Sequence, residues 1–253
     1  MNKKLIILFL CSILSAQEKT EPQNREIWDP EPKIVSPGNL SSPPSDAIIL
    51  FDGTNFSNWQ HSKTKKPVNW ILNNDKSMTI KLGTGSIETK MEHGSIQLHI
   101  EWKSPKIISG EGQSRGNSGI FLQRRYEIQV LDSYKNRTYS NGQASSVYKQ
   151  YVPLVNASLP PGEWQTYDII FNEPKYNSMG IEIKSGYLTV IHNGILVHNN
   201  VQILGTTDNV GMPKLNRDDL PGEDSKYGTH RSLLLQDHGD GKVSYRNIWM
   251  RKL

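Results

Sequence analysis

The sequence predicts an all-β protein in which two sheets pack against each other as a sandwich. From Ile48 onward, apolar residues alternate with polar ones in short runs that end at Gly, Asn, Asp or Pro, a pattern typical of half-buried strands. No long amphipathic helix is indicated, and about a dozen such strands suit two packed sheets. A chain of 253 residues is compatible with one large all-β domain.

The alternation is clearest in two segments. In residues 95–102, every second side chain is apolar, while His99 and Glu101 point the other way. In residues 126–131, Glu127 and Gln129 share the polar side. If these strands were neighbours, their polar sides would form one wall. Further strands are expected at residues 48–51, 78–81, 119–123, 164–171, 187–191, 195–198, 233–237 and 243–251.

Two connections stand out between the expected strands. Asn193-Gly194 joins two apolar runs, and this dipeptide supplies the positive φ angles of a tight hairpin turn. Residues 204–232 are polar, rich in Gly, Asp and Pro, and too long for an ordinary connection. We interpret this stretch as a loop that lines a binding site, with a mobile surface loop as the alternative.

The first sixteen residues have the layout of a secretory signal peptide. Lys3 and Lys4 precede an apolar run over residues 5–14, and Ala16 is a small residue at the expected cleavage site. The run is too short for a membrane span, which needs about 20 apolar residues. We therefore expect a secreted or periplasmic protein without a transmembrane segment. Lipid anchoring through Cys11 is the less favoured alternative.

Composition divides the remaining chain into an arm and a domain. Residues 17–46 hold six of the fourteen prolines and little apolar periodicity, which predicts an extended arm. Residues 47–253 carry the strand pattern. Cys11 is the sole cysteine, so the processed chain would have neither a disulfide nor a thiolate nucleophile. Without Lys3 and Lys4, 27 basic residues face 25 acidic ones, and this formal charge of +2 argues against a nucleic-acid footprint.

Ordered motifs run through residues 47–253 and together resemble one known family. They are Leu-Phe-Asp-Gly at 50–53, Gly-Asn-Ser-Gly-Ile at 116–120, Tyr-Glu-Ile-Gln-Val-Leu-Asp at 126–132, Pro-Gly-Glu-Trp at 161–164, Leu-Gln-Asp-His-Gly-Asp at 235–240 and Arg-Asn-Ile-Trp at 246–249. The set resembles the bacterial 3-keto-disaccharide hydrolase domain, over about four fifths of the chain. The resemblance implies a concanavalin-like jelly roll, export to the periplasm or cell surface, and cleavage of glycosides whose sugar is oxidised at carbon 3.

A ketone at carbon 3 acidifies the proton on carbon 2, so a base can start a β-elimination that expels the glycosidic oxygen. Water then adds to give the free keto sugar, which leaves hydrolase and lyase both open. Such a reaction needs a general base, a group that stabilises the enolate, and a proton donor. Ordinary glycoside hydrolysis would instead need two carboxyls about 5–10 Å apart, and Glu101 with Glu127 is the candidate pair.

Three residues are candidates for catalysis. Glu127 lies on a polar strand side beside Gln129, although an exposed sheet edge would look the same. Asp132 follows that strand directly. His238 lies in the motif that most resembles the family, and imidazole can serve as base, acid or metal ligand. A structural hydrogen bond is the alternative for His238.

Five residues are candidates for substrate binding because their side chains suit hydroxyl groups. They are Glu101, Asn117, Gln129, Gln236 and Arg246. Solvated surface, turn formation at Asn117 and an ion pair at Arg246 are the alternatives.

A divalent cation held by some of Glu101, Glu127, Asp132 and His238 is compatible with an oxygen-rich site, but no motif of fixed spacing identifies one. Neither a nicotinamide site nor a phosphate-binding loop is indicated. The resemblance therefore implies a separate sugar 3-oxidoreductase as a pathway partner. The alternative functions are a non-catalytic carbohydrate-binding, lectin-like module and a surface adhesion protein tethered by the arm.

Overall fold

The computed structural model describes residues 25–39, 42–177, 179, 181–207, 231–239 and 241–253. The chain divides into two units, Met1–Val35 and Ser36–Leu253. In the first unit, residues 25–35 form no β-strand, and Trp28 is 79% exposed. The expected signal peptide, the arm up to residue 24 and most of the long connection, at 208–230, lie outside the described residues.

Residues 36–46, which the proline content assigns to the arm, are grouped with the second unit. The Asp46 carboxylate accepts hydrogen bonds of 2.8 Å from both Nε and Nη2 of Arg251. The Ser36 N–H donates to Ser45 Oγ at 3.0 Å. These contacts extend the folded domain to Ser36, because a bidentate Arg–carboxylate pair fixes both partners in orientation.

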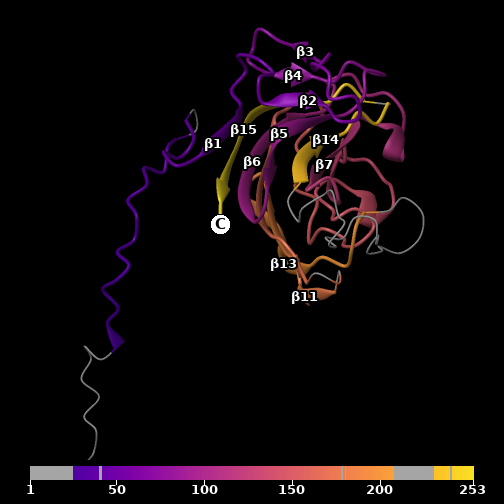
Figure 1. The fold of residues 1–253 in the computed structure, drawn as a ribbon. Coiled ribbons are helices and arrows are strands. Elements are labelled where there is room, and N and C mark those ends of the chain that lie inside the picture. Colours follow the sequence, from indigo (N-terminus) through magenta and orange to yellow (C-terminus); the bar gives the residue numbers. More distant parts are fainter. Residues whose placement is uncertain (1–24, 40–41, 178, 180, 208–230, 240) are drawn as a thin grey trace, which may run out of the picture. The chain divides into compact units, whose positions relative to one another are not determined.

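The domain is a sandwich of two antiparallel sheets, which confirms the predicted fold class (Figure 1). The larger sheet has eight strands. Its order is β13 (Ile195–Gln202), β12 (Tyr187–His192), β9 (Gln165–Asn172), β6 (Ile96–Lys103), β15 (Ser244–Lys252), β4 (Met78–Thr79) and β3 (Ile71–Leu72), with β1 (Ile48–Phe51) also paired to β15.

The smaller sheet has five strands. Its order is β2 (Trp59–His61), β5 (Ile87–His93), β14 (Arg231–Leu235), β7 (Asn117–Leu122) and β8 (Tyr126–Leu131). A further hairpin pairs β10 (Lys175–Tyr176) with β11 (Glu182–Lys184). Helix in the described residues is confined to short 3₁₀ segments such as Gly112–Ser114 and Ser140–Gly142, and none is long and apolar enough to cross a bilayer.

The hydrophobic core lies between the two sheets. Tyr126 of β8 packs against Phe171 of β9, with ring centroids 5.7 Å apart. The Tyr245 hydroxyl of β15 donates to Ser118 Oγ of β7 at 2.7 Å. Both contacts cross from one sheet to the other, so they identify the inward side of each strand. Full burial of one large apolar side chain contributes about 1.5–3 kcal/mol, and this core holds more than two dozen of them.

The strand alternation turns Glu101 and Glu127 away from that core in opposite directions. Ile100 and Trp102 are buried in the core, so Glu101 between them faces outward from the larger sheet. By the same alternation, Glu127 faces outward from the smaller sheet. The hypothesis that their strands are neighbours is therefore wrong, because β6 lies between β9 and β15 while β8 pairs with β7 in the other sheet.

Most predicted strands are confirmed to within a few residues. The predicted hairpin turn at Asn193-Gly194 is also confirmed. Asn193 and Gly194 have φ angles of 51° and 79° between β12 and β13. The sequence analysis missed β5, in which three exposed residues, Lys90, Met91 and Glu92, follow one another. Its pairing with β14 also shifts register between Ser232 and Leu234, so the period-two pattern is interrupted there.

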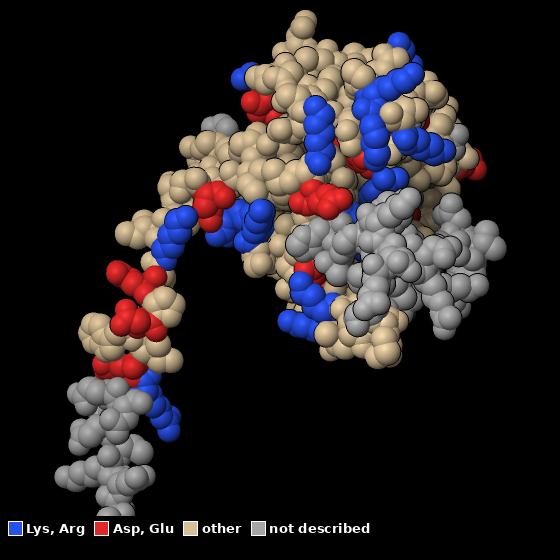
Figure 2. Space-filling view, viewed as in Figure 1, with Lys and Arg blue, Asp and Glu red and all other residues tan. Residues whose placement is uncertain are grey.

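The domain surface carries both signs of charge. On the face drawn in Figure 2, Lys and Arg side chains gather on the upper part of the domain, with Asp and Glu side chains beside them. On β5 the buried Glu88 carboxylate binds both Lys65 and Arg124, the latter at 3.0 Å. Lys65 and Arg124 are thus both paired with one carboxylate of the smaller sheet.

We expect Gly194→Ala to lower the free energy of unfolding by about 1–2 kcal/mol, the cost of a left-handed conformation for a residue with Cβ. A Cβ at this position would have no heavy atom within 4 Å, so backbone strain alone should act. Urea denaturation measures the change. A neutral substitution would show that the turn does not constrain this hairpin.

Candidate functional site

Four of the expected site residues meet on the outer face of the five-stranded sheet. Gln129 lies opposite Gly119 across β8 and β7, and its side-chain amide is 3.2 Å from Asn117 Oδ1. The Gln236 N–H donates to the Gly119 carbonyl at 3.0 Å, which anchors the residue just beyond β14. Glu127 lies two residues before Gln129 on the same side. Of the eight site residues expected from the sequence, the structure therefore brings Asn117, Glu127, Gln129 and Gln236 together on one face.

The carboxyl of Glu127 occupies space that Gly119 leaves open. A Cβ atom at Gly119 would lie 2.3 Å from Glu127 Oε1 and 2.7 Å from Phe121 Cε2. Glycine is thus required here for close approach rather than for a special φ angle. Glu127 is only 3% exposed.

Burial of the Glu127 carboxyl raises its pKa to about 8. In the orientation that satisfies its neighbours, the side-chain NH₂ of Gln129 donates a hydrogen bond of 3.2 Å to Glu127 Oε1. Within the described part of the chain, no basic side chain forms an ion pair with Glu127. A carboxyl in such surroundings can take up and release a proton near neutral pH.

One amide group of this face is incompletely satisfied by the described residues, and a second is oriented by its hydrogen bonds. Gln236 Oε1 is buried without a hydrogen-bond partner among them. Asn117 Nδ2 donates to the Gln113 carbonyl at 2.7 Å, which orients its amide toward Gln129. Buried amides with unused acceptors are suited to bind hydroxyl groups of a ligand.

Tyr148 lies beside Glu127, with Tyr139 and Lys149 next to Tyr148, and the sequence analysis missed all three. The Tyr148 N–H donates to the Glu127 carbonyl at 3.0 Å. The hydroxyls of Tyr139 and Tyr148 are 2.6 Å apart, and Lys149 Nζ lies 5.9 Å and 5.6 Å from their ring centroids. They belong to the turn-rich segment after β8, where no alternation marks them. Its repeated tyrosines were the available signal.

The phenol of Tyr148 is held in its protonated form. Burial, then the hydrogen bond with Tyr139, and to a smaller degree the charge of Glu127 raise the pKa of Tyr148 above its ordinary value. A neutral phenol is a proton donor. The face therefore combines a carboxyl that titrates near neutrality with a hydroxyl that keeps its proton.

Thr207 was also missed, and it fixes the edge of β8. Its hydroxyl oxygen accepts a hydrogen bond of 2.9 Å from the Glu127 N–H. Its own N–H donates to the Arg125 carbonyl at 2.8 Å. The backbone of Glu127 is thus held from both sides, since its carbonyl accepts from Tyr148.

The other two catalytic candidates have different surroundings. Asp132 Oδ2 binds Arg115 Nη2 at 2.5 Å, and both side chains are buried. That ion pair engages the carboxylate and fixes the turn after β8, so Asp132 is not a free base. His238 is exposed and follows Gln236 by two residues. Its neighbour Asp237 orders the turn by accepting from the Gly85 and Gly239 N–H groups at 3.0 Å and 3.2 Å.

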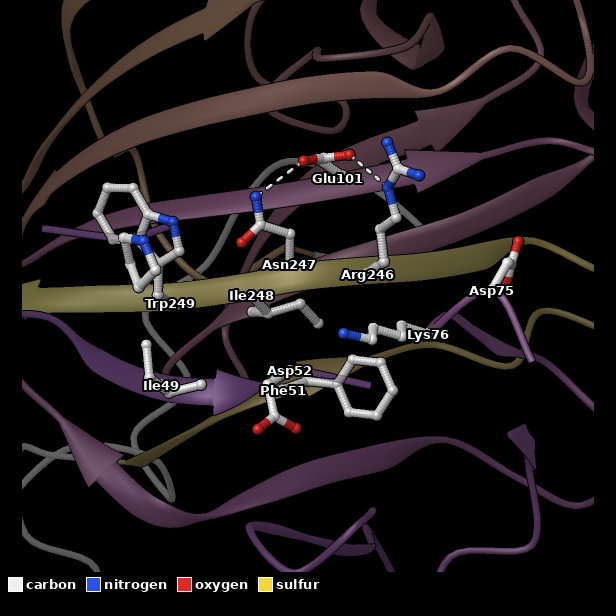
Figure 3. Close-up of a pocket in the computed structure, with 11 residues that line it drawn as sticks. Ile49, Phe51, Asp52, Asp75, Lys76, Glu101, Arg246, Asn247, Ile248 and Trp249 are labelled. Carbon is white, nitrogen blue, oxygen red and sulfur yellow. Dashed lines mark hydrogen bonds and ion pairs between the residues drawn. The ribbon is translucent and has the colours of Figure 1, made fainter. Parts of the chain in front are cut away.

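Glu101 and Arg246 lie on the opposite outer face, that of the eight-stranded sheet. Arg246 Nε donates to Glu101 Oε2 at 2.6 Å, and Asn247 Nδ2 donates to Glu101 Oε1 at 2.8 Å (Figure 3). The Arg246 guanidinium also lies 4.1 Å from the ring centroid of Trp164. The structure therefore corrects the hypothesis that Glu101 and Glu127 flank one scissile bond, and it separates Arg246 from the Glu127 face.

A cavity of about 450 Å³ opens beside this ion pair. Its walls come from β1, β6, β15 and the turn before β4. The lining residues are Pro43, Ile49, Phe51, Asp52, Asp75, Lys76, Glu101, Arg246, Asn247, Ile248 and Trp249 (Figure 3).

His99 links the cavity to a second carboxylate. Burial by itself would lower the pKa of His99, but its hydrogen bonds and charge interactions with Asp168 and Glu101 raise it to about 9. His99 Nδ1 lies 2.7 Å from Asp168 Oδ1, and the ring stacks on Trp249 with centroids 5.0 Å apart. For Glu101, burial would raise the pKa, but hydrogen bonds from His99, Asn247 and Arg246 lower it to about 2.

The candidate metal ligands do not converge. Glu101 and Glu127 point away from each other across the sandwich, and Asp132 is engaged by Arg115. In the described ranges, no three His, Cys, Asp or Glu side chains are grouped so that they could hold a metal ion. The donor set expected from the sequence therefore does not fit a cation, and we derive no step through one.

Comparison with family models identifies one family for this chain. The sequence model of the family described as 3-keto-alpha-glucoside-1,2-lyase-like domain matches residues 46–251. A search of curated proteins found no match.

Three solved structures from Parabacteroides distasonis, each provisionally designated a glycosyl hydrolase, are similar to this chain. One, at 2.13 Å resolution, is 43% identical with a TM-score of 0.84, and the match covers 92% of this chain and 97% of that one. A second is 22% identical, with a TM-score of 0.55 and coverage of 82% and 94%. The third is 21% identical, with a TM-score of 0.53 and coverage of 82% and 99%. The last two show the fold alone.

We expect Gly119→Ala to destabilise the domain by about 1–3 kcal/mol, the usual cost of overpacking. Its Cβ would meet the Glu127 carboxyl, so the shorter side chain of Glu127→Asp should recover part of the loss. Urea denaturation of both single variants and the double variant measures this coupling. Strictly additive effects would contradict the close approach.

The raised pKa of Glu127 predicts a dependence of stability on pH. Because the folded pKa of about 8 lies above the unfolded value of about 4.3, the folded state binds more protons between these values. The free energy of unfolding should therefore fall as pH rises through this window. Glu127→Gln should remove this slope. At about pH 8, the free energy of unfolding of the variant should exceed that of the native protein by a few kcal/mol.

Urea denaturation at several pH values measures both curves. Glu92→Gln is the matched control, because Glu92 is an exposed carboxylate on β5, and it should leave the slope unchanged. Parallel curves for the native protein and Glu127→Gln would contradict the raised pKa.

Proposed function

Because this chain belongs to the 3-keto-alpha-glucoside-1,2-lyase-like domain family, we propose that it is a carbohydrate-active enzyme that cleaves glycosides carrying a ketone at carbon 3. The observation that carries this proposal is the Glu127 carboxyl, buried without a counter-charge in the described structure and surrounded by amides. Its pKa of about 8 suits a general base that works near neutral pH.

The proposed reaction begins at carbon 2 of the keto sugar. The ionised Glu127 removes the carbon 2 proton, and the electron pair moves into an enolate with the carbon 3 ketone. Collapse of the enolate forms the C1–C2 double bond and expels the glycosidic oxygen. Addition of water then places a hydroxyl on carbon 1 and a proton on carbon 2, which gives the free keto sugar. If the product leaves before water adds, the enzyme acts as a lyase.

Tyr148 is the proposed donor of the proton that the leaving oxygen needs. Its phenol is protonated and lies in the segment that is hydrogen-bonded to the Glu127 backbone. Tyr139 accepts or donates through the 2.6 Å hydroxyl contact, and the ammonium of Lys149 near both rings favours the phenolate that forms. Asn117, Gln129 and Gln236 would hold the sugar hydroxyls.

The location and partner are part of the same proposal. The apolar run behind Lys3 and Lys4 supports export to the periplasm or the cell surface. The ketone must be made by a separate sugar 3-oxidoreductase, because nothing in the motifs of this chain suggests a nicotinamide site.

An assay with a 3-keto-α-glucoside disaccharide tests the reaction. Glu127→Gln should lower kcat by about 10²–10⁴, the usual contribution of a general base. Tyr148→Phe should lower kcat more than it changes KM, and Tyr187→Phe on β12 is the conservative control. The native kcat/KM should rise with pH and level off above about 8. Unchanged kcat in Glu127→Gln would overturn the assignment.

Turnover in D₂O distinguishes elimination from ordinary hydrolysis. Elimination followed by hydration places one solvent deuterium on carbon 2 of the released keto sugar, which mass spectrometry detects. Direct displacement at carbon 1 leaves carbon 2 untouched. Product without deuterium would rule out the proposed route, after correction for slow exchange of the free keto sugar.

A further inference from the structure

A bulge in β15 gathers polar and aromatic side chains around the cavity on the larger sheet. Arg246 pairs with Glu101 and Trp249 pairs with His99, so the register shifts by one residue between them. Asn247 absorbs the extra residue with a φ of 46°. In a regular strand, residues 246 and 249 would face opposite sides, but here Arg246, Asn247 and Trp249 all line the cavity. Bulges commonly re-aim side chains at binding sites.

Several polar groups in this cavity keep donors or acceptors that form no hydrogen bond with the described residues. Glu101 occupies the Nε of Arg246 and the Nδ2 of Asn247. No hydrogen bond within the described residues involves the terminal nitrogens of Arg246, Asn247 Oδ1 or Lys76 Nζ. Figure 3 shows the Lys76 ammonium extending across the cavity toward Ile248. Donors and an acceptor are thus available to a ligand without rearrangement of the ion pair.

Apart from the carboxylates of Asp52 and Asp75, the rest of the lining is apolar. Ile49 is 38% exposed, whereas Phe51 and Ile248 are buried beneath the cavity. Trp249 stands at one side, fixed by its stack on His99. An apolar surface with a few oriented polar groups at its rim is the usual construction of a small-molecule site, and a pyranose ring has the same division between its C–H faces and its hydroxyl edges.

The charges around the cavity are balanced. Carboxylates of Asp52, Asp75 and Glu101 face the cationic Lys76 and Arg246. Behind Glu101, the cationic His99 pairs with the Asp168 carboxylate, and Lys103 Nζ lies 4.0 Å from Asp75 Oδ2. Four carboxylates and four cations are thus present around the cavity. An anionic or cationic ligand would meet repulsion as well as attraction, so the balance favours a neutral one.

We propose that this cavity is a second saccharide-binding site, which takes a neutral pyranoside and carries out no chemistry. Trp249 and Ile49 provide the apolar surface, and Arg246, Asn247 and Lys76 bind the hydroxyls. The site lies on the outer face of the sheet opposite to Glu127, so a glycan can be held there while the Glu127 face stays free. The inference stands on the cavity alone and does not depend on the reaction at Glu127.

Calorimetric titration of the full-length protein with methyl α-D-glucopyranoside, an unoxidised sugar, tests the site. Ile49→Trp should fill the cavity from β1 and weaken binding at least tenfold. Ile170→Trp is the matched control, because Ile170 is 39% exposed and faces outward from the same sheet opposite Gln97. It should leave the affinity unchanged. Lys76→Met, which removes the ammonium and keeps the stem, should also weaken binding and guards against misfolding of Ile49→Trp.

The imidazole NMR signals of His99 report the location of the sugar. They should shift on addition of the glucoside, because His99 stacks on Trp249, and the shift should disappear in Ile49→Trp. Absence of binding by the native protein would overturn the proposal. So would binding that Ile49→Trp and Lys76→Met both leave intact, or binding that does not move the His99 signals.

Discussion

The packing of the two sheets decides which side chains of this protein can meet. Contacts such as Tyr126 against Phe171 and Tyr245 with Ser118 hold the sheets face to face. Because successive side chains of a strand alternate, each inward residue of this core turns its neighbour outward. The polar residues therefore divide into two separate faces. A register slip by one residue would exchange core and surface, so both sites depend on the same interface.

The two outward carboxyls, Glu101 and Glu127, show how strongly surroundings control one residue type. Burial without a counter-charge in the described structure raises the pKa of Glu127 to about 8. Glu101 is also shielded, but hydrogen bonds from His99, Asn247 and Arg246 outweigh the burial and lower its pKa to about 2. One is thus suited to proton transfer and the other to a permanent ion pair. The first is a reactive group, and the second is a fixed support for a binding surface.

A glycine and a strand bulge position the polar groups of the two faces. Gly119 has no side chain, and the Glu127 carboxyl occupies the resulting space against the sheet. The bulge at Asn247 adds one residue to β15 and so brings Arg246 and Trp249 to the same side. Both features act on the backbone, which is the rigid part of a sheet. Strand pairing consequently fixes the positions of Glu127, Arg246 and Trp249, whereas Tyr148 and Lys76 are held by turns.

The sequence by itself determined the fold class, the family resemblance and most strands, because alternation and turn chemistry are local and survive in the linear chain. It also predicted Asn117, Glu127, Gln129 and Gln236 as site residues, and strand pairing places them in one group. It placed Glu101 and Arg246 with that group wrongly, since alternation tells which side of a strand a residue takes but not which sheet the strand joins. Tyr148, Gly119 and the Asn247 bulge were recognised only in three dimensions. Strand order and register arise from pairing between distant segments, and no local pattern records them.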